Sequence, residues 1–211
     1  MRGIAFIGGE CPQPLLCKRY AEKAQCIVAA DSGLMTVEYA GIIPDWIVGD
    51  MDSLDDMHRL DHYPPEKIKR YPQDKDYTDT ELALQILWEH GCDQTWLVGG
   101  GGGRLDHVFA LRALFERTPH PQRWISARED IHSLESDTVF TETYKPGTCI
   151  SLFTCGTGPW YAESTGLKWP LAPLPWSRDF FSLSNQAEGT VSITVLKGSF
   201  LLICNISNIL E

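Results

Sequence analysis

Aspartates with metal-ligand spacing are the first residues in this sequence that could do chemistry. Asp50 and Asp52 directly follow the apolar segment Trp46–Val48. In an extended chain, side chains at positions i and i+2 point to the same side, so these two carboxylates could share one hard cation. A solvated acidic face is the alternative, because the segment from Asp45 to Glu81 holds eleven carboxylates against five lysines or arginines.

A glycine-rich loop is the second candidate site. Five glycines, Gly99–Gly103, follow a strand-like segment and lead through Arg104 to a helix-like segment that begins near Asp106. Backbone N–H groups at such a junction can approach an anion closely, and the Arg104 guanidinium offers a planar fork for phosphate oxygens. The loop matches neither the P-loop pattern nor a clean G-x-G-x-x-G pattern. A turn without a ligand, with Asp106 as a helix cap, is the alternative.

A third candidate lies at a predicted helix start. Thr78 and Glu81 form a T-x-x-E capping box, and Gly91 follows the helix as a stop signal. Asp79 adds another carboxylate at this position. A purely structural role is equally compatible, because Thr78 would cap the helix and Asp79 would complement its dipole whatever the function.

The elements that position these residues alternate between strand and helix up to about residue 130. The predicted strands are Gly3–Ile7, Cys26–Ala30, Trp46–Val48 and Thr95–Val98. The predicted helices are Gln13–Lys23, Leu34–Tyr39, Thr78–His90 and Asp106–Glu116. Strand–loop–helix repetition predicts an α/β fold with a parallel sheet and helices on its faces.

The candidate residues follow the carboxyl ends of these strands. Gly8-Gly9, Asp31, the Asp50/Asp52 pair and the loop Gly99–Asp106 should therefore converge on one edge of the sheet. Ligands bind beyond that edge in open α/β sheets. Carboxylates for Mg²⁺ beside an arginine and glycine amides for phosphates favour a nucleoside-triphosphate site, where phosphoryl transfer needs charge neutralisation and positioning.

The second part of the chain follows a different pattern. Its predicted strands are Val139–Tyr144, Thr148–Thr154, Thr190–Leu196 and Phe200–Ile203, separated by turn signals such as Pro-Gly and Lys-Gly. We therefore predict two domains, an α/β domain over residues 1–132 and a small all-β domain over residues 133–211.

Composition excludes several classes of function. The 211-residue chain has a net charge of −10, which disfavours a nucleic-acid partner held by phosphate neutralisation. No stretch reaches the 18 or so apolar residues that a membrane-spanning helix needs, so no membrane partner is expected. The seven cysteines form no CxxC pair, which favours free thiols in a reducing compartment, by default the cytoplasm.

In order along the chain, five motifs resemble those of the thiamine pyrophosphokinase family. They are Asp31-Ser32-Gly33, Pro44–Ser53, Lys75–Ala83, Gly102–His107 and Gly166–Leu171. The resemblance implies a Rossmann-like catalytic domain and a β-sandwich thiamine-binding domain. It also implies a homodimer, whose active sites would lie between the α/β domain of one subunit and the β domain of the other. The implied reaction converts ATP and thiamine to AMP and thiamine diphosphate with Mg²⁺ as cofactor.

The resemblance also implies roles for individual residues. The metal ligands would be Asp50, Asp52 and Asp79. The ATP-binding residues would be Thr78, Gly102, Gly103, Arg104 and Asp106. The thiamine-binding residues would be Trp169, Ser184 and Asn185, with Trp169 stacking on a thiamine ring. Asp31 and Asp74 are candidates for a general base, and both could equally orient metal-bound water.

Three alternatives stay open on the sequence alone. A related pyrophosphokinase could use another alcohol acceptor, such as a pterin. A non-catalytic sensor could bind thiamine or a nucleotide, although a binder has no need of three carboxylates around a cation. A nucleotide-sugar transferase could use the D-x-D pair, but this leaves the glycine–arginine–aspartate loop unexplained. The sequence departs from the family pattern in the proline-rich stretch Pro170–Pro175 and in Val108–Leu111.

Overall fold

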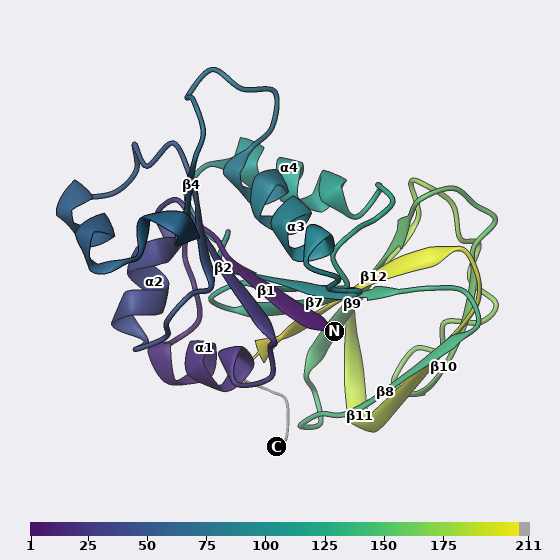
Figure 1. The fold of residues 1–211 in the computed structure, drawn as a ribbon. Coiled ribbons are helices and arrows are strands. Elements are labelled where there is room, and N and C mark those ends of the chain that lie inside the picture. Colours follow the sequence, from purple (N-terminus) through teal and green to yellow (C-terminus); the bar gives the residue numbers. More distant parts are fainter. Residues whose placement is uncertain (207–211) are drawn as a thin grey trace. The chain divides into compact units, whose positions relative to one another are not determined.

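The chain folds into two compact units, seen in a computed structural model that describes residues 1–206 (Figure 1). The first unit comprises Met1–Leu111 and Trp124–Ala127. The second comprises Arg112–Arg123 and Arg128–Glu211. The chain thus crosses between the units more than once, whereas the predicted boundary is a single one at residues 132/133. The functional domains 1–132 and 133–211 stay a prediction.

The first unit contains a parallel sheet. Its parallel strands are β1 (Arg2–Phe6), β2 (Cys26–Ala30), β3 (Trp46–Gly49), β4 (Ile68–Arg70) and β5 (Gln94–Val98), in the order β5-β1-β2-β3-β4, and β6 (Arg123–Ile125) is the next neighbour of β5. Ala5 on β1 lies opposite Val28 on β2 and Leu97 on β5. The four predicted strands are confirmed to within two residues at each end. The sequence missed β4 and β6, because three residues are too few to show a period.

Helices cover both faces of this sheet (Figure 1). They are α1 (Pro14–Ala21), α2 (Gly33–Tyr39), α3 (Asp79–Glu89) and α4 (Leu105–Leu114), with 3₁₀ segments at Met57–His62 and Pro65–Lys67. The helices α1 and α2 lie on one face and α3 on the other. Gly33 is required at the start of α2, because a Cβ there would lie 2.1 Å from the Phe6 carbonyl oxygen. The prediction of a parallel sheet with helices on its faces is confirmed.

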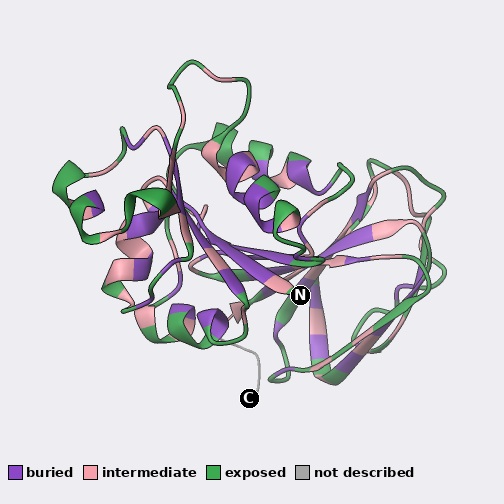
Figure 2. Cartoon of the chain, in the orientation of Figure 1, coloured by how far each residue is buried: buried purple, intermediate pink, exposed green. Residues whose placement is uncertain are grey.

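The helix α3 packs an apolar face against the sheet and so stabilises it. Its buried residues are Leu82, Ala83, Leu84, Ile86 and Leu87. Together with the largely buried strands β1 and β2, they form the apolar interior that Figure 2 shows in purple. At 11 residues, α3 is the longest helix within residues 1–206, and no helix in that range is long and apolar enough to cross a bilayer.

Antiparallel strands make up most of the second unit. They are β7 (Glu129–Leu134), β8 (Thr138–Thr143), β9 (Cys149–Cys155), β10 (Tyr161–Leu167), β11 (Phe181–Lys197) and β12 (Ser199–Asn205). The order is β10-β11-β9-β12-β7, and β8 also pairs with β11. The 17-residue strand β11 pairs with β9 through its first part and with β8 through its second part. It therefore belongs to two layers of strands.

One apolar cluster fills the second unit. Tyr144, Ile150, Val191, Phe200 and Leu202 are each at most 1% exposed and belong to it. The four predicted strands are confirmed as β8, β9, the second part of β11, and β12. The sequence missed β7, β10 and the first part of β11. Exposed polar residues weaken the alternation of apolar and polar side chains in β10 and in the first part of β11, whereas β7 has a buried charged residue, Asp130, where an apolar one is expected.

Candidate active site

The carboxyl edge of the parallel sheet collects the candidate residues of the first unit. Asp31 follows β2 and Asp50 follows β3, while Gly99 follows β5. Because β5, β1, β2 and β3 are parallel neighbours, their carboxyl ends meet at one edge. The predicted convergence is therefore confirmed. The sheet order also reverses between β1 and β5, and this switch point is where open α/β sheets bind ligands.

Three carboxylates come together at this edge. One oxygen each from Asp31, Asp50 and Asp79 lies within 4.8 Å of the other two. Asp31 has a positive φ of 49°, which aspartate tolerates better than most residues, and its amide donates to the Val48 carbonyl at 2.8 Å. Gly49, with a φ of 144°, leaves room for the group, since a Cβ there would lie 3.1 Å from Asp79 Oδ1.

Lys75 lies among these carboxylates and is a functional candidate that the sequence reasoning missed. Its Nζ atom is 3.0 Å from Asp50 Oδ2 and 3.2 Å from Asp79 Oδ1, and its side chain is only 11% exposed. A hydrogen bond from Lys75 lowers the pKa of Asp50, whereas burial raises the pKa of Asp79. Burial also opposes the charge of Lys75, but hydrogen bonds to the two carboxylates outweigh burial and raise the pKa of Lys75. Lys75 lies before α3 begins at Asp79, so the helical i,i+4 spacing does not apply and no local pattern marks it.

The donor set fits a divalent cation. Carboxylate oxygens are the ligands that Mg²⁺ prefers, and the ammonium of Lys75 shows that a cation is stabilised among them. Asp31 Oδ1 is buried and has no hydrogen-bond partner within residues 1–206. A buried carboxylate oxygen without a partner is costly in a structural role, so a ligand is its best explanation.

Asp52 does not enter this group. The expectation that Asp50 and Asp52 point to the same side assumes an extended chain and is wrong, because Met51 between them has a φ of 67°. The Asp52 carboxylate accepts hydrogen bonds from Gln73 Nε2 at 2.8 Å and Ser53 Oγ at 3.0 Å, and the Asp52 amide donates to Asp50 Oδ1 at 3.2 Å. A ligand role for Asp52 stays a prediction.

Two further predicted residues lie on the segment between β4 and α3. Asp74 is exposed and is not part of the three-carboxylate group. Thr78 is the N-cap of α3, and the predicted capping box is confirmed. Its hydroxyl accepts from the Glu81 amide at 3.3 Å, and its own amide donates to Glu81 Oε2 at 2.8 Å. The cap fixes the start of α3, where the helix dipole favours the negative charge of Asp79.

In the glycine loop, some backbone amides donate hydrogen bonds to carbonyls and others do not. The amides of Gly99, Gly100 and Gly101 donate to the carbonyls of Ile125, Gly8 and Glu10. By contrast, within residues 1–206 the amides of Gly102 and Gly103 donate to no backbone carbonyl. Both have positive φ values, 65° and 67°, which glycine adopts readily. The two glycines predicted to bind ATP are thus the ones whose amides are available to donate to a ligand.

Arg104 and Asp106 pair with each other directly after this loop. Arg104 donates from Nε to Asp106 Oδ1 at 3.1 Å and from Nη2 to Oδ2 at 2.6 Å. The hydrogen bonds raise the pKa of Arg104 and lower that of Asp106. Both side chains are well exposed at the start of α4, at 71% and 61%. Asp106 therefore orients a guanidinium whose remaining donors face solvent.

The predicted thiamine-binding residues lie in the second unit. Trp169 is 51% exposed, but Asn185 is buried, and its amide clamps the main chain of Trp169. Asn185 Oδ1 accepts from the Trp169 amide at 3.2 Å, and Asn185 Nδ2 donates to the Trp169 carbonyl at 2.6 Å. The structure thus brings Trp169 and Asn185 together, with Asn185 positioning the tryptophan. Ser184 is exposed beside them, with a φ of 54°.

Comparisons with known proteins agree with these features. Residues 17–123 match the profile of the family described as "Thiamin pyrophosphokinase, catalytic domain". The chain is 34% identical over 90 residues to a thiamine pyrophosphokinase of Bacillus subtilis (strain 168), a match that spans 42% of each chain. The chain also resembles the crystal structure of thiamin pyrophosphokinase from Geobacillus thermodenitrificans. The TM-score is 0.76 and the identity 26%, over 97% of each chain.

The fold is shared with further solved structures. Thiamine pyrophosphokinase from Bacillus subtilis superposes with a TM-score of 0.79 at 23% identity, covering 97% of this chain and 99% of that one. Thiamin pyrophosphokinase from Candida albicans gives a TM-score of 0.72 at 17% identity, covering 97% and 88%. These likenesses concern the mixed α/β fold alone. Because the family profile covers half of the sequence, we conclude that this chain belongs to the thiamin pyrophosphokinase family.

Proposed function

We propose that this protein transfers the pyrophosphoryl group of ATP to the hydroxyl of thiamine, giving AMP and thiamine diphosphate. The observation that carries the proposal is the group of Asp31, Asp50 and Asp79 at the carboxyl edge of a parallel sheet. The same edge carries the glycine loop after β5, two strands from β2 and three from β3, or about 10 to 14 Å away. Carboxylates for a cation and amides for phosphates at this separation suit a bound triphosphate.

In this proposal the glycine loop and Arg104 hold the triphosphate. The open amides of Gly102 and Gly103 donate to phosphate oxygens, as amides do at the start of a helix. Arg104 adds a charge-assisted contact, and Asp106 keeps its guanidinium oriented. Negative charge on the departing AMP would thus meet donors that are already in place.

Asp50 and Asp79 would hold Mg²⁺, and the structure leads us to add Asp31 to the predicted ligands. When bound, Mg²⁺ would neutralise phosphate oxygens and so lower the barrier to attack on phosphorus. Lys75 keeps the carboxylates close together through its two ion pairs. Its ammonium is also a candidate contact for a phosphate oxygen. Asp74 stays a candidate for a general base. Asp31 was the other candidate, but a carboxylate that binds Mg²⁺ is not free to take the proton of the thiamine hydroxyl.

The second unit would bind thiamine. We propose that the first unit is the Rossmann-like catalytic domain and that the second is a β-sandwich presenting Trp169 to a thiamine ring. A homodimer would complete the active site, with Trp169 supplied by a partner subunit. An exposed apolar surface on β9 and β11 supports dimerisation: Phe153 stacks on Phe181 at 5.2 Å, while Phe181 and Leu183 are 46% and 54% exposed. The seven free cysteines support a cytoplasmic location.

A product assay tests the proposal. The purified protein is incubated with ATP, Mg²⁺ and thiamine, and nucleotides and thiamine esters are separated by chromatography. We expect AMP and thiamine diphosphate in equal amounts. ADP with thiamine monophosphate would instead mean attack on the γ-phosphorus. No thiamine ester, but turnover with another alcohol such as a pterin, would change the acceptor, and ATP binding without any turnover would indicate a sensor.

A further inference from the structure

We propose that Lys168 is an internal competitor of the substrate at the face of Trp169, and that it weakens the binding of thiamine. The inference rests on the proposed function, because it takes thiamine as the ligand of Trp169. Two cations would occupy the same face of the Trp169 ring: the ammonium of Lys168 and the positively charged thiazolium ring of thiamine.

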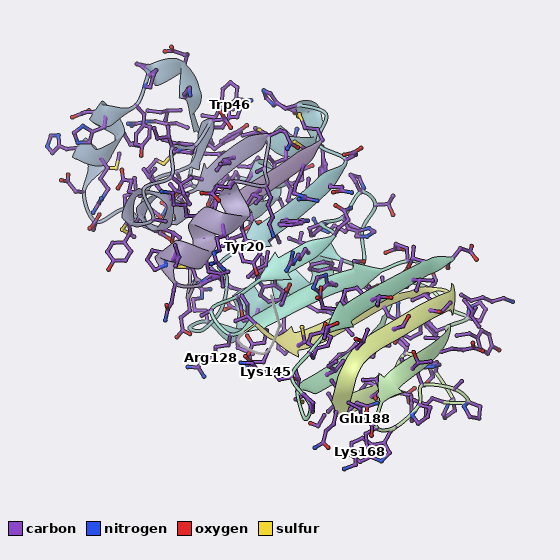
Figure 3. All side chains as sticks on the ribbon, turned by 90° about the horizontal axis from the view of Figure 1, so that it is seen from below. Tyr20, Trp46, Arg128, Lys145, Lys168 and Glu188 are labelled. Carbon is purple, nitrogen blue, oxygen red and sulfur yellow. The ribbon has the colours of Figure 1, made fainter. Side chains whose placement is uncertain are left out.

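Lys168 already covers the tryptophan. Its Nζ atom lies 4.6 Å from the centroid of the Trp169 ring, inside the range of a cation–π contact. The ring is 51% exposed, so the face is reachable from solvent. Figure 3 shows Lys168 projecting from the surface of the second unit. An incoming ring can therefore stack on this face only after the ammonium moves.

The tryptophan itself is held in place. The Asn185 side chain binds both the amide and the carbonyl of Trp169, and the Lys168 amide donates to the Gln186 carbonyl at 2.9 Å. The main chain of both residues is thus fixed to β11. Because the backbone is anchored, exchange of one cation for another requires movement of the Lys168 side chain only.

Lys168 also has a second partner beside the ring. Its Nζ atom donates to Gln186 Oε1 at 3.2 Å while it covers the ring, so this hydrogen bond helps to hold the ammonium over Trp169. A compact ammonium is strongly hydrated and mobile, whereas a planar thiazolium can stack and loses less hydration. The thiazolium therefore replaces the ammonium on the Trp169 ring. The net affinity for thiamine is lower by the free energy of the cation–π contact that Lys168 loses.

Calorimetric titration with thiamine tests the inference. The full-length protein is compared with Lys168→Ala, which uncovers the ring, and with Lys168→Arg, which keeps a cation over it. We expect the Kd for thiamine to fall about two- to fivefold in Lys168→Ala and to stay within about twofold in Lys168→Arg. The gain should persist at high salt, because a short-range ring contact is screened less than a long-range repulsion.

Each other outcome is informative. Unchanged binding in Lys168→Ala overturns the inference and leaves the proposed function intact. Weaker binding of thiamine by Lys168→Ala would show that Lys168 contacts the substrate. A gain in affinity that vanishes at high salt would show that Lys168 acts only by long-range charge repulsion. Both results overturn the competitor role. If none of the three proteins binds thiamine, the proposed function fails and the inference fails with it.

Discussion

The carboxylate group of the first unit and the Trp169 region of the second unit differ in how they are positioned. Asp31 and Asp50 are attached directly to the ends of neighbouring strands, and Lys75 pairs with Asp50 and with Asp79 at the start of α3. Trp169 lies after β10 on a loop and depends on one buried amide, that of Asn185. The first arrangement is rigid because the sheet itself sets it. The second depends on a few hydrogen bonds, so it should respond more gradually to substitution.

Removal of a carboxylate from the first unit should have the largest effect on the transfer rate. We expect Asp50→Asn to reduce the transfer rate by about 10²- to 10³-fold or more, because a neutral amide is a weaker ligand for the Mg²⁺ that would neutralise the phosphate oxygens. The fold should persist, which far-UV circular dichroism would show. Asp52→Asn is the matched control: its carboxylate lies outside the three-carboxylate group, so we expect a clearly smaller loss. Equal losses would support the predicted ligand role of Asp52.

A second substitution distinguishes the binding of ATP from the binding of thiamine. Arg104→Ala removes the guanidinium that Asp106 orients, and we expect the KM for ATP to rise about tenfold or more while the KM for thiamine stays unchanged. Initial rates at varied ATP and thiamine give both constants. Arg104→Lys should recover little, since an ammonium cannot make the forked contact. A rise in the thiamine KM alone would contradict the assignment.

The Trp169 region is tested through its clamp. Asn185→Ala leaves the amide and carbonyl of Trp169 without their partners, at a cost of about 1–3 kcal/mol in the free energy of unfolding. We expect the KM for thiamine to rise about tenfold, with a smaller change in kcat, because the ring is still present but less well placed. Trp169→Phe, which keeps an aromatic ring and the clamp, should be affected less. The opposite ranking would show that Asn185 contacts thiamine directly.

The smallest expected effect is a pH dependence of stability. A hydrogen bond with His120 lowers the pKa of Glu135 to about 2, and the same pair raises the pKa of His120. The Glu135 contribution is present above its ordinary pKa of 4.5 and is lost as the pH falls toward 2. The His120 contribution is complete below its ordinary pKa of 6.5 and is lost as the pH rises through the higher folded-state value.

The pair should therefore stabilise the protein most between about pH 4.5 and 6.5. Glu135→Gln should lower the free energy of unfolding by about 1 kcal/mol or less in that window, since Glu135 is 44% exposed and solvent screens the pair. Denaturant unfolding at several pH values measures the difference. A difference that is constant with pH would mean that the pair contributes only packing.

Sequence reasoning placed the first region better than the second for a physical reason. Periodicity reveals buried strands, and parallel strands bring their ends together, so Asp31 and Asp50 could be assigned to one edge in advance. The missed details depend on single backbone angles and on irregular chain. The positive φ of Met51 separates Asp52 from Asp50, and the segment before α3 that carries Lys75 has no period to read. The Asn185 clamp joins residues 16 positions apart, and Asn185 lies at a register shift of β11 against β9, which no local pattern encodes.

The long strand β11 has a consequence for how the second unit opens. Because its 17 residues pair with β8, β9 and β10, neither layer can separate without disturbing the same strand. In hydrogen exchange, the amides of β11 that pair with buried partners should be among the slowest, and they should exchange together with those of β12. The second unit would then unfold as a single cooperative block, and a chain break within β11 would damage the whole block at once.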